Sequence, residues 1–255
     1  LIKKNNLIGV EFQDSIFSLA ASNMIIHGDG KTRIFNEDCF KITDQIKKLR
    51  PNVGLLNPPY KSDEDDTEEL EFVFNNLDCL TPGGICVAII PVSCVNDDSQ
   101  KILSLKELLL SKHTLEGAMS MPQDIFHNSK VGVTTCIIVI KAHQKHPDNH
   151  KTYLGYWRED MFEKRKNLGR IDVGFWNQVK SNWLTSYQKH KVRDGKVKLD
   201  EINEIGSKGY GILKNLKANQ EWCIENYLTT DYSNFKKEDF EKTLKAYLAF
   251  KITDD

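Results

Sequence analysis

Around Val53-Gly54-Leu55-Leu56-Asn57-Pro58-Pro59-Tyr60 the chain passes from a short apolar run into a rigid polar loop. A β-strand cannot continue through two prolines, because each lacks a backbone donor and fixes its own φ. The first proline also restricts Asn57 before it. The loop presents an amide, non-helical carbonyls and an aromatic ring, which suits a flat substrate with an amino group. Asn57 Oδ1 and the Pro58 carbonyl would accept the two amino hydrogens, and Tyr60 would stack. Alone, the same pattern also fits an ordinary turn.

Apolar runs alternate with helical patterns through the first 150 residues. The predicted strands cover 7–12, 32–36, 53–56, 85–91, 115–121 and 133–141. Helices are predicted at 16–26, with Asp14 or Ser15 as the cap, at 43–49 and at 99–111. A further helix is predicted after the acidic run 62–69, and the beginning of that run is expected to be mobile. This alternation is typical of a doubly wound α/β sheet, whose ligands lie beyond the carboxyl ends of the strands. Glu11, Asp38, Asn57 and Pro91 are expected on that rim.

A domain boundary is predicted near residue 150, between a sheet domain, 1–150, and a mainly helical extension, 151–255. The extension carries helical patterns at 172–189, 222–228 and 237–250, and an irregular stretch at 195–210. The histidine-rich tract at 143–150 could bind a metal, but nothing nearby completes a ligand set. We interpret it as a solvated loop and predict no metal site.

Composition sets broad limits on function. The 255 residues have a net charge of −1, so the overall charge does not indicate binding to nucleic acid. A local basic patch that binds nucleic acid is still compatible with this net charge. No apolar run is long enough to cross a bilayer. The six cysteines form no C-x-x-C pair and several lie in apolar runs. Buried reduced thiols are therefore expected, which predicts a cytoplasmic protein.

Two acids follow predicted strands ahead of the Asn-Pro-Pro-Tyr loop. Glu11 is suited to a vicinal diol, because one carboxylate can accept hydrogen bonds from both ribose hydroxyls. Asp38 could accept from an adenine amino group while the Cys39 amide donates to a ring nitrogen. Taken alone, each of these acids could equally be a helix-capping residue or a solvent-exposed residue without a ligand. Their order, strand-Glu, strand-Asp and strand-Asn-Pro-Pro-Tyr, is the specific signal.

In this order the motifs resemble those of the adenine-N6 DNA methyltransferases that use S-adenosylmethionine. The match is closest to the modification subunit of type I restriction-modification systems and their fused relatives, and it covers nearly the whole chain. The matching segments are a ribose-binding strand at 8–11, an adenine-binding strand at 36–39, the catalytic motif at 57–60, the L-x-P-G-G…P strand at 80–91, the base-packing motif at 121–126 with 134–139, and C-terminal segments at 157, 166–172 and 222–232.

The resemblance implies direct methyl transfer to adenine N6 of a base flipped out of the duplex. The implied catalytic residues are Asn57, Pro58, Pro59 and Tyr60, with Tyr60 and Phe126 stacking on the base. The implied cofactor-binding residues are Glu11, Phe12, Asp38, Cys39 and Asn57. The implied partners are double-stranded DNA, a specificity subunit and, as a further candidate, a restriction subunit.

One departure from the family pattern is expected to matter. The family's first strand and Gly-containing loop have no counterpart, because only ten residues precede Glu11. We therefore expect a Rossmann-like sheet that lacks its first strand, in an N-terminally incomplete enzyme that is inactive on its own and binds S-adenosylmethionine poorly. Two alternatives stay open: a methyltransferase acting on a protein glutamine amide or an RNA guanine, and a non-catalytic assembly module.

Overall fold

The computed structural model describes residues 6–28, 33–126, 133–165, 168–189, 210–228 and 236–245 without 239 and 243. Its strands are β1 (Ile8–Glu11), β2 (Arg33–Asn36), β3 (Val53–Leu56), β4 (Ile85–Pro91), β5 (Thr114–Ser120), β6 (Thr135–Lys141), β7 (Thr152–Tyr156), β8 (Phe162–Arg165), β9 (Gly169–Asp172) and β10 (Gly211–Lys214). Its helices are α2 (Asp14–Ile26), α3 (Thr43–Lys48), α4 (Glu69–Cys79), α5 (Ser93–Asn96), α6 (Gln100–Lys112) and α7 (Trp176–Lys189). The alternation predicted for the first 150 residues is present.

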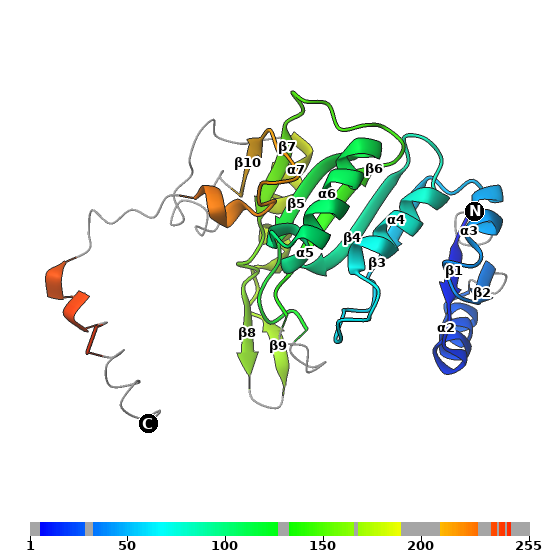
Figure 1. Ribbon diagram of the computed structural model, residues 1–255. Helices are drawn as coiled ribbons and strands as arrows, with labels where there is room; N and C mark the ends of the chain where they lie inside the picture. The colour runs from blue at the N-terminus through cyan, green and yellow to red at the C-terminus, as the bar shows by residue number, and fades with distance from the viewer. Residues whose placement is uncertain are drawn as a thin grey trace.

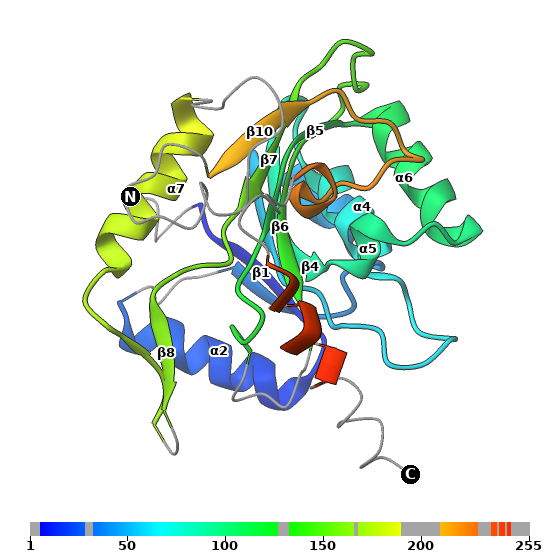
Figure 2. The same ribbon diagram turned by 90° about the vertical axis from the view of Figure 1, so that its left-hand side faces the viewer.

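The main sheet has six strands in the order β10-β7-β5-β6-β4-β3. Strands β3 and β4 are parallel, and β6 runs antiparallel between β4 and β5. Helices α4, α5 and α6 cover one face of the sheet and α7 lies on the other (Figure 2). The sheet continues past residue 150, since β7 pairs with β5 and β10 with β7. The described part of the extension therefore contains strands as well as helix, and both its mainly helical character and the division into two domains stay predictions.

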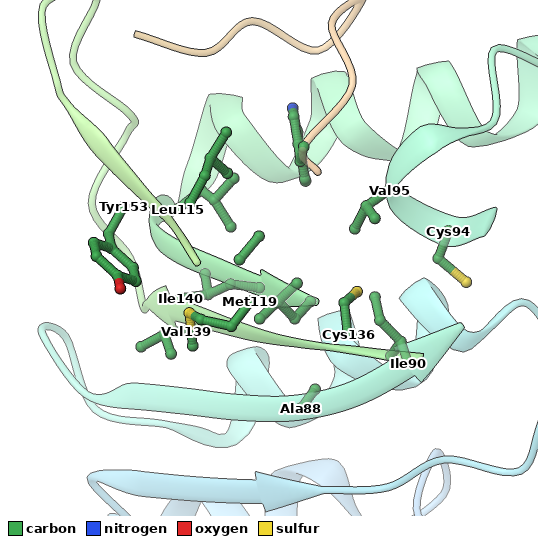
Figure 3. Close-up of a cluster of buried hydrophobic side chains, with 14 of the residues drawn as sticks. Ala88, Ile90, Cys94, Val95, Leu115, Met119, Cys136, Val139, Ile140 and Tyr153 are labelled. Carbon is green, nitrogen blue, oxygen red and sulfur yellow. The ribbon is translucent and has the colours of Figure 1, made fainter. Parts of the chain in front are cut away.

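The core of the molecule lies in the middle of this sheet, where helices cover both faces. Leu115, Ile138, Ile140 and Leu154 have no exposed surface, and Figure 3 shows the central part of the cluster around β4, β5 and β6. Burying a side chain of this size stabilises the fold by roughly 1.5–3 kcal/mol. At the sheet's β3 edge, Gly54 permits a close approach of α4, because a Cβ there would lie 1.9 Å from Asn76 Oδ1.

Strands β1 and β2 form a separate parallel pair with α2 as their connection. The pair lies beyond β3 at one end of the molecule (Figure 1). No residue of α2 is buried, and Phe12 and Ile25 are 68% and 66% exposed. On the facing edge of the main sheet, Leu55 of β3 is 78% exposed. The apolar side predicted for α2 is thus only partly covered by the described residues.

Three local predictions need correction. The cap of α2 is Gln13, without a side-chain hydrogen bond, and the Asp14 carboxylate instead accepts from Asn36 Nδ2 at 2.7 Å. The helix predicted at 222–228 is a single 3₁₀ turn, Ile224–Tyr227. The acidic run after Tyr60 is an ordered turn, in which Asp66 Oδ2 accepts from the backbone amide of Ser62 at 3.0 Å. The predicted irregular stretch at 195–210 and helix at 237–250 fall largely outside the described residues.

Most of the histidine-rich tract is exposed, as predicted, but its middle is buried. His146 is only 7% exposed and its Nδ1 accepts from the Leu115 amide at 3.3 Å. His143 Nε2 lies 2.9 Å from the carbonyl oxygen of Leu80, the residue after α4, so the tract contacts both β5 and the end of α4. The described residues hold no group of side chains able to bind a metal ion. Within the same residues, no helix has the length and apolarity that a membrane span requires.

Candidate active site

The Asn57–Tyr60 loop begins where β3 ends. Leu56 is paired with Ala88 of β4, so the loop starts at the carboxyl edge of a parallel pair. Pro58 is buried while Asn57 is exposed, which anchors the loop and leaves the amide side chain at the surface. The Tyr60 hydroxyl donates to Asn57 Oδ1 at 3.2 Å. The amide and the ring that the sequence singled out are therefore adjacent.

A second aromatic ring reaches the same place from the loop after β5. The rings of Tyr60 and Phe126 meet edge to face, with centroids 6.1 Å apart and planes at 82°. The start of that loop is held by the Met121 amide, which donates to the Thr135 carbonyl at 2.9 Å. Burial raises the pKa of Tyr60 to about 12, so its phenol is neutral at pH 7 and acts as a hydrogen-bond donor.

Buried acids lie directly behind the loop, and the sequence reading missed them. The Lys61 amide, next in the chain after Tyr60, donates to Glu69 Oε1 at 2.8 Å. Glu68 caps α4 in a capping box with Glu71 and forms ion pairs with Lys61 and Lys101. The available signal was Glu68 followed three residues later by Glu71, a capping-box pattern. It was hidden within a longer acidic run.

The acids proposed for the nucleoside lie together on the other sheet. Glu11 is paired with Asn36 in the β1–β2 register, which brings Glu11 and the residues after β2 to the same edge. Glu11 Oε1 accepts from the Gln13 amide at 2.8 Å, and Asp38 Oδ1 accepts from the Phe40 amide at 2.9 Å. These bonds orient both carboxylates at the carboxyl ends of their strands, the position expected for ligand binding.

Phe12 and Cys39 flank these acids in different environments. Phe12 is 68% exposed, so its ring is available at the end of β1. Cys39 is partly buried, and its burial raises the pKa of the thiol. The carbonyl of Cys39 accepts from Asn75 Nδ2 of α4 at 3.1 Å. Cys39 is thereby tied to the main body of the molecule.

The two halves of the candidate site are linked through α4. The rings of Phe40 and Phe72 have centroids 4.9 Å apart, beside the bond from Asn75 to Cys39. Among the described residues, no hydrogen bond joins Glu11 or Asp38 to the Asn57–Tyr60 loop. The structure therefore brings together Asn57, Tyr60 and Phe126, and separately Glu11 and Asp38, on two sheets connected by one helix.

Comparisons with known proteins identify the family of the chain. The family model described as "N-6 DNA Methylase" matches residues 2–251. A type II restriction enzyme and methyltransferase, RM.BcgI of Heyndrickxia coagulans, is 31% identical over 98% of this chain. This chain spans only 38% of that relative's length.

Solved structures show the fold at lower identity. A type I restriction-modification methyltransferase subunit from Streptococcus thermophilus matches with a TM-score of 0.65 and 17% identity, over 88% of this chain and 48% of that one. A modification subunit of a putative type I restriction enzyme from Vibrio vulnificus matches with a TM-score of 0.60 and 16% identity, over 87% and 49%. The mixed α/β fold is thus that of restriction-modification methyltransferase subunits. With the family model matching nearly its whole length, the chain belongs to the N-6 DNA methylase family.

Proposed function

We propose that this chain forms part of an enzyme that transfers a methyl group from S-adenosylmethionine to adenine N6 in a specific DNA sequence, as the modification component of a restriction-modification system. The observation that carries the proposal is the cluster of Asn57, Tyr60 and Phe126. An amide acceptor and two aromatic rings within one cluster suit a flat base bearing an amino group, and family membership supplies the chemistry.

Each residue of the loop has a role in this proposal. A flipped adenine would enter between the rings of Tyr60 and Phe126, which now meet edge to face and would have to separate. Asn57 Oδ1 and the Pro58 carbonyl would then accept the two N6 hydrogens. Because Asn57 Oδ1 now accepts from the Tyr60 hydroxyl, the base must displace that bond. Pro59 keeps the loop rigid. In this proposal the positioning of the base by the loop supplies most of the acceleration of methyl transfer.

The neutral phenol of Tyr60 fits this mechanism. Its pKa, raised to about 12 by burial, keeps the ring uncharged at pH 7, and an uncharged ring stacks on a base without adding charge beside the amine. Two hydrogen bonds accepted from N6 would localise the nitrogen lone pair and leave it aligned for attack. No strong base is required before the amine attacks, and the proton is lost afterwards.

The residues at the ends of β1 and β2 fit the nucleoside part of S-adenosylmethionine. Glu11 offers carboxylate oxygens to a ribose diol, Asp38 an acceptor to the adenine amino group and the Cys39 amide a donor to its ring. The exposed ring of Phe12 lies beside them. Asn57 would bridge the cofactor side and the base side. The bound cofactor would supply an electrophilic methyl group.

We further propose that a strand from outside the described residues fills the space between β1 and β3. This position corresponds to the first strand of the family's sheet. It is supported by the exposure of Leu55 on β3 and by the absence of buried residues in α2. A helix accompanying that strand would cover these apolar side chains. Without that segment, the 255 residues would bind S-adenosylmethionine poorly and be inactive.

The proposed partners follow from the proposed activity. They are double-stranded DNA with a flipped adenine, a specificity subunit, and a restriction subunit as a further candidate. The solved relatives include methyltransferase and modification subunits of type I systems. All six cysteines are free thiols, which favours the cytoplasm as the location.

The test measures incorporation of labelled methyl groups into DNA by the full-length protein with its specificity partner. Asn57→Ala is expected to lower the rate by roughly 10²–10³-fold, the usual cost of removing one preorganised hydrogen-bonding group. Asn52→Ala, at an exposed position just before β3, is the matched control and should retain the wild-type rate. The proposal is wrong if the product is methylglutamine or methylguanine, or if DNA receives no label.

One specific observation favours the second candidate, a non-catalytic assembly module. The exposed apolar side chains of β3 and α2, such as Leu55 and Ile25, would form a surface for a partner protein. Calorimetry with S-adenosylmethionine separates the two candidates for this chain. Submicromolar binding by the 255 residues would contradict the proposed dependence on a further strand, whereas absence of binding together with activity of the full-length protein would support it.

A further inference from the structure

A buried carboxylate behind the proposed catalytic loop has no role in the chemistry described so far. Glu69, the first residue of α4, is 4% exposed. Its Oε1 accepts from the Lys61 amide at 2.8 Å, and its Oε2 lies 3.4 Å from Cys94 Sγ, the donor of the second bond. Figure 3 shows Cys94 on α5 at one end of the core. One side chain thus connects the loop, α4 and the helix that follows β4.

The environment of Glu69 differs from that of its neighbour. Glu68 is balanced by two cations, Lys61 Nζ at 2.7 Å and Lys101 Nζ at 2.8 Å. Among the described residues, no ion pair includes Glu69, whose two hydrogen-bond donors are an amide and a thiol. A buried carboxylate is costly unless it is hydrogen-bonded or lies near positive potential. The start of α4 supplies that potential through the helix dipole.

The Lys61 amide belongs to the peptide group that joins Tyr60 to Lys61. Because a peptide group is planar, a hydrogen bond to its N–H fixes the plane and with it the ψ angle of Tyr60. Holding this peptide group limits how far the Tyr60 Cα, and with it the ring beside Asn57 and Phe126, can move. At the other end the loop is fixed by β3 and by buried Pro58. Glu69 is thus the restraint at the exit of the loop.

We propose that Glu69 is a positioning residue for the catalytic loop, acting through the reach of its carboxylate to the Lys61 amide. The inference rests on the proposed function, because the loop matters only if it handles the target base. Glu69 does not touch the base. It holds Tyr60 in the geometry in which Asn57 Oδ1 and the ring are adjacent, and loss of that geometry by about 1 Å would cost up to roughly 100-fold in rate.

Two conservative variants distinguish the effect of the length of the Glu69 side chain from the effect of its charge. Glu69→Asp keeps the charge at the helix start but shortens the side chain by one methylene, so its carboxylate no longer reaches the Lys61 amide. Glu69→Gln keeps the reach and an oxygen acceptor but removes the charge. The matched controls are Glu64→Asp and Glu64→Gln, at an exposed position of the same acidic run.

The first measurement is methyl transfer by the full-length protein with its specificity partner. Measured at a temperature where the variant is fully folded, Glu69→Asp is expected to lower kcat about 10–100-fold, with S-adenosylmethionine affinity close to wild type. Glu69→Gln should keep kcat within about threefold, and both Glu64 variants should match wild type. A Glu69→Asp enzyme with unchanged kcat, or a larger loss in Glu69→Gln than in Glu69→Asp, overturns the proposal.

The second measurement does not depend on activity. In the 255-residue chain labelled with 3-fluorotyrosine, the Tyr60 signal is identified by its absence in Tyr60→Phe. Glu69→Asp should shift or broaden that signal, while Glu69→Gln should leave it near the wild-type position. An unmoved Tyr60 signal in Glu69→Asp overturns the positioning role. If the wild-type enzyme fails to methylate DNA but the Tyr60 signal still responds, the proposed function fails and the loop restraint stands.

Discussion

The six-stranded sheet and the β1–α2–β2 unit carry the two halves of the candidate site but are packed very differently. Ile138 in β6 has no exposed surface, whereas Ile25 in α2 is 66% exposed. Both segments are apolar, so sequence composition does not distinguish them. The two regions differ in the helices packed against them. Helices α4, α5, α6 and α7 lie over the main sheet (Figure 2), whereas no residue of α2 is buried.

This difference means that packing within the described residues supports the proposed base side of the site but not the proposed nucleoside side. Asn57 and Tyr60 sit on a loop fixed by a buried proline and by Glu69. Glu11 and Asp38 are oriented by local turn hydrogen bonds, on a pair of strands that joins the rest chiefly through contacts with α4. Rigid support is what preorganises a binding site, so the nucleoside side should gain most from additional cover.

Hydrogen exchange should show the largest contrast between the two regions. Backbone amides of β6 are expected to exchange only through global unfolding, while those of β1 exchange through local opening. In the 255-residue chain we expect at least about 10³-fold slower exchange for β6, equivalent to roughly 4 kcal/mol. Mass spectrometry of peptides from 133–141 and 6–12 measures this. Equal protection of the two peptides would contradict the comparison.

Matched truncations of one residue type should give the next largest contrast. Ile138→Ala removes a fully buried side chain and should lower the free energy of unfolding by about 2–5 kcal/mol. Ile25→Ala removes a mostly exposed one and should change it by less than about 0.5 kcal/mol. Urea denaturation followed by fluorescence measures both. A cost above about 1.5 kcal/mol for Ile25→Ala would mean that α2 is covered in solution.

Acid should destabilise the main sheet through two buried histidines. Burial, reinforced by the neighbouring His143, lowers the pKa of His113 to about 4, and burial with the neighbouring His150 lowers that of His146 to about 4. In the unfolded chain each would bind its proton near pH 6.5. The unfolded state therefore binds more protons between those values, so stability is full above about pH 6.5 and falls as the pH drops towards 4.

The size and origin of this pH effect can be measured by unfolding at a series of pH values. We expect a loss of up to roughly 3 kcal/mol for each histidine between pH 6.5 and 4. His113→Gln should flatten the profile, because it removes one buried titrating group. Asn23→Gln, at an exposed and non-titrating position of α2, is the control and should leave the profile unchanged. A profile that His113→Gln does not alter would assign the acid sensitivity to other groups.

Sequence analysis predicted the features that depend on local sequence pattern. It missed the contacts between residues that lie far apart in the sequence. The strand ends near Glu11 and Leu56 follow from apolar runs that stop at polar residues or prolines. The stacking of Tyr60 and Phe126 on a base came from family resemblance and stays a prediction, although the two rings contact each other. Glu69 was overlooked because its partners, Lys61 and Cys94, come from a preceding loop and a later helix. The pairing of β7 with β5 and of β10 with β7 was missed because long-range pairing leaves no local periodicity.

The exposed face of β3 allows the smallest but most direct test of the comparison. Leu55 is 78% exposed, so Leu55→Gln should change the free energy of unfolding of the 255-residue chain by less than about 0.5 kcal/mol. Leu154→Gln, at a fully buried position of β7, is the matched control and should be strongly destabilising, because it buries an amide among apolar side chains.

In a longer protein whose additional strand and helix cover β3, as proposed above, the same Leu55→Gln change should cost about 1–3 kcal/mol, since the amide would then be buried. Urea denaturation of the Leu55→Gln variant of both proteins measures the two changes in unfolding free energy. Their difference is the contribution of the strand and helix that cover β3. Equal and small effects in the two contexts would show that nothing packs on this face. The space between β1 and β3 would then be an open surface in the whole protein as well, and the nucleoside site would have to form without it.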